Sequence, residues 1–290
     1  MNVLSLFDGI SCGRVALERS GIKVDSYYAS EIDKYAIQIA QKNYPDTIQL
    51  GDISNYESWD LPEIDMVIGG SPCQDLSVLK LNRQGLSGDK SGLFYKFVGC
   101  IERFRPQYFL LENNRSMPAE AKEEITSILG VHPIEINSAL LSAQYRRRLY
   151  WTNIPGVEQP KDRKLRLNDI VQSEESKTGY ECSDKLLNRT KGHLAVQMAK
   201  KSIKQLTQKS NCLTTGQRIT NKGATTIQYP NGRYYILTPL ECERLQTLPD
   251  GYTYGISNTQ RYKAIGNGWT VDVIAHILRY INQSVNAECA

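Results

Sequence analysis

Short apolar runs alternate with amphipathic segments along the first half of this chain, and this alternation constrains the fold more than any other feature. The apolar runs predict strands, and the amphipathic segments between them predict helices. The predicted strands are Val3–Leu6, Tyr27–Ala29, Met66–Ile68, Phe109–Leu111 and Leu149–Trp151, and the predicted helices are Gly13–Ser20, Asp33–Asn43, Leu93–Phe104 and Ala119–Leu129. Strand–helix alternation at this spacing predicts an α/β fold with a doubly wound, mostly parallel, Rossmann-like sheet.

The second half of the chain differs in composition and charge. From about residue 152 the sequence is polar and rich in Lys, Ser, Thr and Asn. Regular structure is predicted again at Thr238-Pro-Leu-Glu241, which has the pattern of a helix-capping box, and in a last helix over about 270–281. We therefore expect three parts: a main domain over 1–151, a smaller domain over 152–236, and a return to the main domain over 237–290.

Charge is distributed unevenly between these parts. Residues 141–235 hold 18 Lys and Arg against 7 Asp and Glu, whereas the rest of the chain holds 17 against 24. A basic segment on an acidic body favours a polyanionic partner at that segment. A solvated lysine-rich surface that binds nothing explains the same charge pattern about equally well.

Composition narrows the class of protein. The 290 residues include seven cysteines without a Cys-x-x-Cys pair and three scattered histidines, so we expect neither a disulfide framework nor a metal site. No apolar run is long enough to cross a membrane, and Met1–Phe7 lacks the features of a signal peptide. We expect a cytoplasmic enzyme that does not contact membranes, as a monomer or weak dimer.

Cys73 is the candidate nucleophile. It lies in Gly69-Gly-Ser-Pro-Cys-Gln-Asp-Leu-Ser77, directly after the predicted strand Met66–Ile68. Ligands and chemistry collect beyond the strand ends of an open α/β sheet. A buried structural cysteine is the alternative, but the polar, glycine-rich context favours a reactive thiol.

Carboxylates follow other predicted strands at the same edge. The loop Leu6-Phe-Asp-Gly-Ile-Ser-Cys-Gly13 is not a dinucleotide fingerprint, because Asp8 would repel a pyrophosphate; it suits a cofactor with a cationic amino-acid part. Glu31 is placed to accept from ribose hydroxyls, and Asp52 is placed to accept from an adenine amino group beside Ile53. Glu112 brings a carboxyl near the thiol. A surface carboxylate at a strand end is the alternative for each.

The ordered motifs resemble those of the DNA (cytosine-5)-methyltransferases, in a compact bacterial or phage form with the first motifs most similar to the de novo branch. These motifs are Phe7-Asp-Gly-Ile-Ser-Cys-Gly13, Gly70-Ser-Pro-Cys-Gln74, Glu112-Asn113, Gln144-Tyr-Arg-Arg-Arg148, Glu241-Cys-Glu-Arg-Leu-Gln246 and Gly266-Asn267. They span almost the whole chain. The resemblance implies transfer of a methyl group from S-adenosylmethionine to C5 of a cytosine flipped out of duplex DNA, through a covalent adduct with Cys73.

The resemblance also implies roles for individual residues. Glu112 would hydrogen-bond or protonate cytosine N3, while Arg146 and Arg148 would hold O2 and the developing charge. The implied cofactor contacts are Phe7, Asp8, Gly9, Ile10, Gly13, Glu31, Ile32, Asp52, Ile53, Pro72, Asn267 and Trp269.

The resemblance places a target-recognition domain at 152–236, with Asn211-Cys-Leu-Thr-Thr215 as its Thr-Leu element. The long loop Val78–Ser91 is expected to close over the flipped base, with Lys80, Leu81, Asn82 or Arg83 filling the vacated space. A loop that inserts no side chain is the alternative. The expected DNA contacts are Gln74, Ser77, Lys80, Asn82, Arg83, Thr214 and Thr215.

Three other functions remain open from the sequence. A transfer-RNA cytosine-5 methyltransferase of the same family is the first, and a DNA-binding regulator without activity is the second. A nicotinamide- or flavin-dependent oxidoreductase is the third, although the chain lacks the glycine fingerprint such enzymes carry. A cognate restriction endonuclease is a further expected partner.

Overall fold

The computed structural model describes residues 1–71, 92–182, 202–216 and 224–288, and its contacts divide the chain into two compact units. Unit 1 consists of Met1–Ile136, Arg147–Gln159 and Ile274–Ala290, and unit 2 consists of Asn137–Arg146 and Pro160–Val273. This division groups residues 237–273 with the basic segment rather than with the N-terminal part. The two units are defined by contacts within the chain, so the predicted functional boundaries at residues 152 and 236 stay a prediction.

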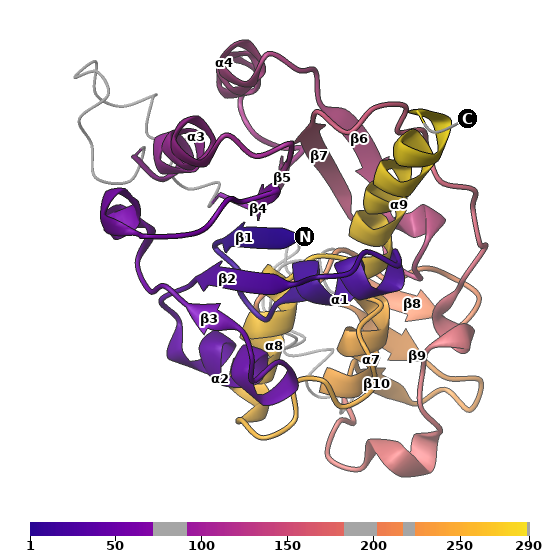
Figure 1. Cartoon of the computed structure of the whole chain (residues 1–290). Helices are drawn as coiled ribbons and strands as arrows, with labels where there is room; N and C mark the ends of the chain where they lie inside the picture. Colours follow the sequence, from indigo (N-terminus) through magenta and orange to yellow (C-terminus); the bar gives the residue numbers. More distant parts are fainter. Residues whose placement is uncertain (72–91, 183–201, 217–223, 289–290) are drawn as a thin grey trace. The chain divides into compact units, whose positions relative to one another are not determined.

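A seven-stranded sheet forms the centre of unit 1, in the order β3-β2-β1-β4-β5-β7-β6 (Figure 1). Its strands are β1 (Asn2–Leu6), β2 (Ser26–Ser30), β3 (Ile48–Gln49), β4 (Met66–Gly69), β5 (Tyr108–Asn114), β6 (Ile134–Asn137) and β7 (Arg147–Thr152). The β1–β2, β1–β4, β2–β3 and β4–β5 pairs are parallel, whereas β5 and β7 pair antiparallel. The predicted mostly parallel α/β sheet is confirmed.

Helices connect the parallel strands as the sequence predicts. They are α1 (Cys12–Arg19), α2 (Lys34–Asn43), α3 (Gly92–Phe104) and α4 (Ala119–Leu129), with the 3-10 helix η1 (Ile53–Ser58) after β3. Asp33, predicted as the start of a helix, is the N-cap of α2, and its carboxylate accepts from the backbone N–H of Tyr35 at 2.9 Å.

One face of this sheet packs against α3 and α4. Side chains from alternate strand positions, such as Leu4 and Leu6 of β1, join Phe94, Phe97 and Ile125 from the helices in a single buried cluster. Gly69, at the end of β4, makes this packing possible. A Cβ on it would lie 3.0 Å from the carbonyl oxygen of Leu6 and 3.1 Å from the ring of Phe97.

Unit 2 has a small sheet of its own. Strand β9 (Thr226–Gln228) pairs parallel with β8 (Ile203–Gln205) and antiparallel with β10 (Tyr234–Ile236). The other elements of this part of the chain are the 3-10 helices η4 (Ser138–Leu140), η5 (Leu167–Asp169) and η6 (Glu174–Lys177), and the helices α7 (Pro239–Leu245) and α8 (Asn258–Asn267). The last helix, α9 (Val271–Glu288), begins in unit 2 and continues in unit 1. Sequence analysis predicts α7 and α9 but not α8, which is mostly polar.

The predicted capping box at the start of α7 is confirmed. The Thr238 hydroxyl accepts from the Glu241 N–H, and the Glu241 carboxylate accepts from the Thr238 N–H. The same carboxylate forms an ion pair of 3.0 Å with Lys177, and neither side chain is exposed to solvent. Among the residues described, no helix is long and apolar enough to span a membrane.

Candidate active site

The loop between β1 and α1 has an unusual backbone. Phe7, Gly9 and Ser11 all adopt left-handed conformations, with φ of 57°, 60° and 58°. Such conformations are uncommon for residues other than glycine and cluster at binding sites, because the surrounding structure must hold them. Ile10, within this loop, and Gly13, in the first turn of α1, are both buried.

Asp8 lies inside the loop and is only 9% exposed. Its carboxylate accepts hydrogen bonds from the hydroxyls of Ser5 (2.6 Å), Tyr27 (2.7 Å) and Ser11 (2.6 Å). Burial raises the pKa of Asp8, and the three hydroxyls act in the opposite direction. The carboxylate thus fastens the loop to β1 and β2, and its contact with a cofactor stays a prediction.

Glu31 follows β2 and binds the same loop from outside. Its Oε2 accepts from the backbone N–H of Gly9 at 2.8 Å, and its Oε1 accepts from the N–H groups of Ile32 and Asp33. A carboxylate has about four acceptor positions, so these three bonds leave room for one hydroxyl donor.

Two further predicted cofactor residues follow β3. Asp52 is exposed, and its Oδ1 accepts from the Ser54 N–H at 2.8 Å, while Ile53 is 4% exposed. The chain turns toward them at Gly51, whose carbonyl accepts from the hydroxyl of Ser30 in β2. Together with Ile32, which is 75% exposed, they supply carboxylate oxygens and an apolar side chain at the ends of β2 and β3. These residue types fit a ligand with a ribose and an adenine.

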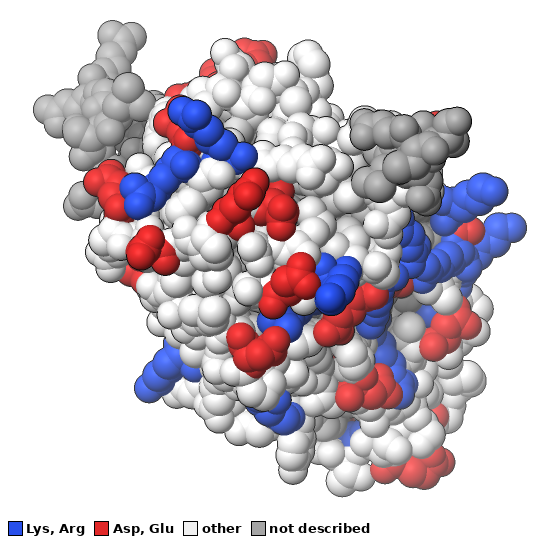
Figure 2. Space-filling view, in the orientation of Figure 1, with Lys and Arg blue, Asp and Glu red and all other residues white. Residues whose placement is uncertain are grey.

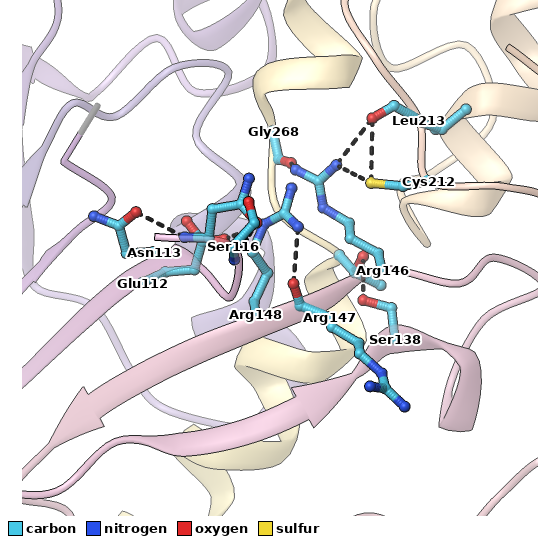
Figure 3. A network of polar contacts seen from close by, with 12 residues as sticks. Glu112, Asn113, Ser116, Ser138, Arg146, Arg147, Arg148, Cys212, Leu213 and Gly268 are labelled. Carbon is cyan, nitrogen blue, oxygen red and sulfur yellow. Dashed lines mark hydrogen bonds and ion pairs between the residues drawn. The ribbon is translucent and has the colours of Figure 1, made fainter. Parts of the chain in front are cut away.

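Glu112 and Arg148 meet across two antiparallel strands. Glu112 of β5 lies opposite Tyr150 of β7, so Arg148, two residues before Tyr150, is its diagonal neighbour on the same face of the sheet. The Arg148 Nε lies 2.9 Å from Glu112 Oε1, with only 14% and 12% of the two side chains exposed (Figure 3). Such a shielded pair presents an acidic and a basic group side by side.

The neighbouring Asn113 ties this strand to the segment that leads to the predicted nucleophile. It is 1% exposed, and its Nδ2 donates to the carbonyl and hydroxyl oxygens of Ser71 at 3.3 and 3.2 Å. Cys73, Pro72, Gln74, Ser77, Lys80, Asn82 and Arg83 lie outside the described residues, as does the predicted base-flipping loop. The described chain therefore holds Ser71, the residue two positions before Cys73, against Asn113 of β5.

Arg146 belongs to unit 2 and is 4% exposed. Its guanidinium donates to the carbonyls of Leu213 (3.2 Å), Gly266 (3.3 Å) and Gly268 (3.0 Å), and its Nη1 lies 3.5 Å from the Cys212 Sγ (Figure 3). These contacts join the predicted Thr-Leu element to the end of α8. The predicted contact of Arg146 with a cytosine base stays untested.

Gln144 and Gln246 reinforce this junction. The Gln144 Oε1 accepts from the Leu213 N–H and its Nε2 donates to Gln246 Oε1, while Gln246 Nε2 donates to the carbonyls of Ile265 and Gly268. A Cβ at Gly266 would lie 2.3 Å from the backbone oxygen of Thr214, so only glycine fits there.

Gln144, Gln246 and Asn113 belong to the motifs, but the sequence alone predicts no role for them. The two glutamines are completely buried and Asn113 nearly so. A buried amide side chain needs partners, and the sequence carries a signal for Gln144 alone, an amide that follows the mostly apolar Ala139-Leu-Leu-Ser-Ala143. Of the other predicted residues, Thr215 and Asn267 are exposed, and Thr214 and Trp269 are half-buried.

Comparisons with known proteins show the family of this chain. The model of the family described as C-5 cytosine-specific DNA methylase matches residues 1–131 and 142–283. The type II methyltransferase M.NlaX of Neisseria lactamica is 27% identical over 306 residues, covering 98% of this chain and 97% of its own length. The type II methyltransferase M1.ScrFI of Lactococcus lactis subsp. cremoris is 28% identical over 311 residues, covering 94% and 75%.

A solved structure shares the fold. The S. pombe Dnmt2 methyltransferase has a TM-score of 0.80 and 19% identity, covering 99% of both chains. The family match covers almost the whole sequence. The chain therefore belongs to the C-5 cytosine-specific DNA methylase family and is an enzyme of the DNA (cytosine-5)-methyltransferase class.

Proposed function

We propose that this enzyme transfers a methyl group from S-adenosylmethionine to C5 of a cytosine flipped out of duplex DNA, through a temporary bond between Cys73 and C6. The observation that carries the proposal is the shielded Glu112–Arg148 pair at 2.9 Å, on the strand whose Asn113 holds Ser71. A thiol two residues further along the chain would work beside one acidic and one basic group.

These residue types match the chemistry of cytosine. C5 is a poor nucleophile, so sulfur must first add to C6 and move electron density to C5. A cysteine thiol is only a few per cent thiolate at neutral pH but is intrinsically very nucleophilic. Glu112 would hydrogen-bond or protonate N3, and Arg148 would stabilise the charge at O2. After C5 receives the methyl group it loses its proton, and the Cys73 sulfur leaves C6 to restore the aromatic ring.

The proposed cofactor site lies at the ends of β1, β2 and β3. S-adenosylmethionine supplies an electrophilic methyl group when bound. Glu31, with one acceptor position open, would take a ribose hydroxyl, and Asp52 would take the adenine amino group, with Ile32 and Ile53 as apolar neighbours. We propose Pro72, Asn267 and Trp269 as further contacts, together with Phe7, Asp8, Gly9, Ile10 and Gly13.

The proposed DNA contacts lie in two regions. Gln74, Ser77, Lys80, Asn82 and Arg83 would approach the strand opened by base flipping, and Thr214 and Thr215 would belong to the recognition surface. The charge of the segment 141–235 supports this, since phosphate contacts dominate the affinity for DNA. Because relatives include type II enzymes of bacteria, we propose that the enzyme acts in the cytoplasm, with a restriction endonuclease of the same recognition sequence as its partner.

The mechanism can be tested by trapping. A duplex with 5-fluorocytosine at the target should capture the enzyme when S-adenosylmethionine is present, because fluorine cannot leave C5 as a proton does. Cys73→Ser should form no adduct, and Glu112→Gln should form it much more slowly, while both keep their affinity for DNA. Cys212→Ser is the matched control, because its hydroxyl can still accept from Arg146.

Specific results would contradict the proposed mechanism or the proposed substrate. An undiminished adduct in Cys73→Ser, or methylation at N4, would overturn the covalent mechanism. Parallel assays with duplex DNA and transfer RNA decide the substrate class, and incorporation into RNA alone would replace DNA by RNA in the proposal. Mapping methylated cytosines in treated DNA would give the recognition sequence.

A further inference from the structure

Unit 2 contains a pocket of about 250 Å³ whose lining carries cationic, hydroxyl and amide groups but no carboxylate. Its lining residues are Tyr145, Arg166, Lys204, Thr207, Gln208 and Lys209. All six lie in the segment 141–235, where basic residues outnumber acidic ones. Lys and Arg side chains gather at the right-hand edge of Figure 2, in the region that holds β8 in Figure 1.

Tyr145 is held in place by its backbone while its ring remains open to solvent. Its N–H donates to the carbonyl of Ser210 at 2.9 Å, and Gln144 forms an isolated bridge with the same residue. The Tyr145 side chain is nevertheless 56% exposed. The exposed ring offers a ligand both an apolar face and a hydroxyl group.

Lys209 is the most buried cation of the pocket lining; burial lowers the pKa of its ammonium, and the charges of Asp162 and Asp169 act in the opposite direction. It is 7% exposed, and its Nζ donates to the carbonyls of Ala139 (2.5 Å) and Ser142 (3.0 Å). Neither acceptor is charged, so the ammonium is not neutralised by these bonds. An ammonium group has three donors, and within the described part of the chain two are used, which leaves one for a ligand.

Arg166 and Lys204 add two further positive charges to the lining, and both residues are half-buried. The Nη1 of Arg166 donates to the carbonyls of Lys164 and Leu165, and its other guanidinium donors have no partner among the described residues. Lys204 lies on β8, where its backbone pairs with Ile227 of β9, and its side-chain ammonium has no hydrogen-bond or ion-pair partner among the residues the structure describes. The nearby carboxylates of Asp162 and Asp169 accept from backbone N–H groups of Lys164 and Arg166.

We propose that this pocket binds one phosphate of the duplex DNA backbone, an inference that rests on the proposed function. Lys204 and Arg166 pair with the phosphate oxygens, Lys209 supplies the charge beneath them, and Tyr145 contacts the adjoining sugar. DNA is favoured over a free anion because Tyr145 lies within Gln144-Tyr-Arg-Arg-Arg148, next to the residues assigned to the reaction. The contact orients the duplex and carries no sequence information.

The test is the salt dependence of DNA affinity. Lys204→Gln should lower the magnitude of the slope of log K against log salt by about 0.9, the value for one neutralised phosphate. Between 50 and 200 mM salt this corresponds to about a 3.5-fold smaller loss of affinity. Lys161→Gln is the matched control, because it removes one exposed lysine of unit 2 outside the pocket and should leave the slope unchanged. Equal urea midpoints for the variants and the wild type confirm that both fold.

A second measurement identifies the phosphate. Single neutral methylphosphonates placed along the duplex should include one position that weakens the wild type but adds no further loss in Lys204→Gln. If the wild type methylates DNA yet the slope and the methylphosphonate profile are the same in Lys204→Gln, the pocket proposal is overturned and the proposed function stands. A wild type that neither binds nor methylates duplex DNA would overturn both.

Discussion

Lys177 and Glu241 form an ion pair with no exposed surface, and removing one partner isolates the other charge. In Lys177→Met, a side chain of similar length stays against the rings of Tyr229 and Tyr235, whose centroids each lie 5.4 Å from the Lys177 Nζ. The packing is therefore kept while the positive charge is lost. Burial lowers the pKa of Lys177 and the Glu241 charge acts in the opposite direction, as expected for a buried pair.

The size of the effect follows from the remaining partners of Glu241. Breaking a buried ion pair costs about 3–5 kcal/mol, because an uncompensated charge stays in the interior. Here the carboxylate keeps two backbone donors, the N–H groups of Thr238 (2.8 Å) and Gln172 (2.9 Å). We therefore expect a loss near the lower end, about 3 kcal/mol, or about 6–12 °C in Tm.

Urea denaturation of the wild type, Lys177→Met and the double variant Lys177→Met/Glu241→Gln measures this. The double variant should be more stable than the single one, because a neutral amide replaces the unpaired buried charge. Lys161→Met, which changes an exposed lysine, should alter stability by less than about 0.5 kcal/mol. A loss below about 0.5 kcal/mol in Lys177→Met, or no recovery in the double variant, would refute the reasoning.

Three further outcomes are expected. Gly266→Ala should cost about 3 kcal/mol in urea denaturation because its Cβ meets backbone at 2.3 Å, whereas the helical control Gly99→Ala meets only the end of a tyrosine side chain; equal losses would contradict this. Burial raises the pKa of the Cys100 thiol to about 12, so mass spectrometry after alkylation at pH 8 should find it unmodified in the native protein, and rapid labelling there would disprove its burial. Asp250→Asn should lower the free energy of unfolding at pH 7 by a fraction of a kcal/mol, and by less as the pH falls below about 4. The Arg244 guanidinium lowers the pKa of Asp250 from 3.8, so the contribution of this ion pair disappears when Asp250 is protonated. A stability difference that is constant with pH would argue against the pair.

The sequence predicts the elements whose signal is local. Val3–Leu6 and Met66–Ile68 are apolar enough to be recognised as buried strands, and Thr238-Pro-Leu-Glu241 carries its own capping box. Helix α8 is not predicted from the sequence, because its residues are largely polar and its buried residues, Ile265 and Gly266, lie only at its end. Strands of three residues, such as β8, are too short to show an alternating pattern.

The residues of the candidate site likewise include some that motifs identify and some that only the folded chain reveals. The motifs identify Glu112 and Arg148 from the sequence. The structure adds that the two side chains pair across the antiparallel strands β5 and β7. The partners of Arg146 cannot be named in this way, since they are backbone carbonyls from residues 213, 266 and 268. A carbonyl has no side-chain signature, so only the folded chain reveals that this arginine joins distant segments.

The division of the chain into units sets rules for building hybrid enzymes. Arg146 and Gln144 contact Leu213, so the proposed recognition segment, transplanted alone, would arrive without the side chains that hold it. The whole of unit 2 should instead be exchanged, that is, the donor's residues 137–146 and 160–273 together, with junctions at the four borders between the units. Hybrids joined at residues 152 and 236 should yield less soluble protein than hybrids joined at the unit borders. Only hybrids joined at the unit borders take Gln144, Arg146 and Leu213 from the same parent protein.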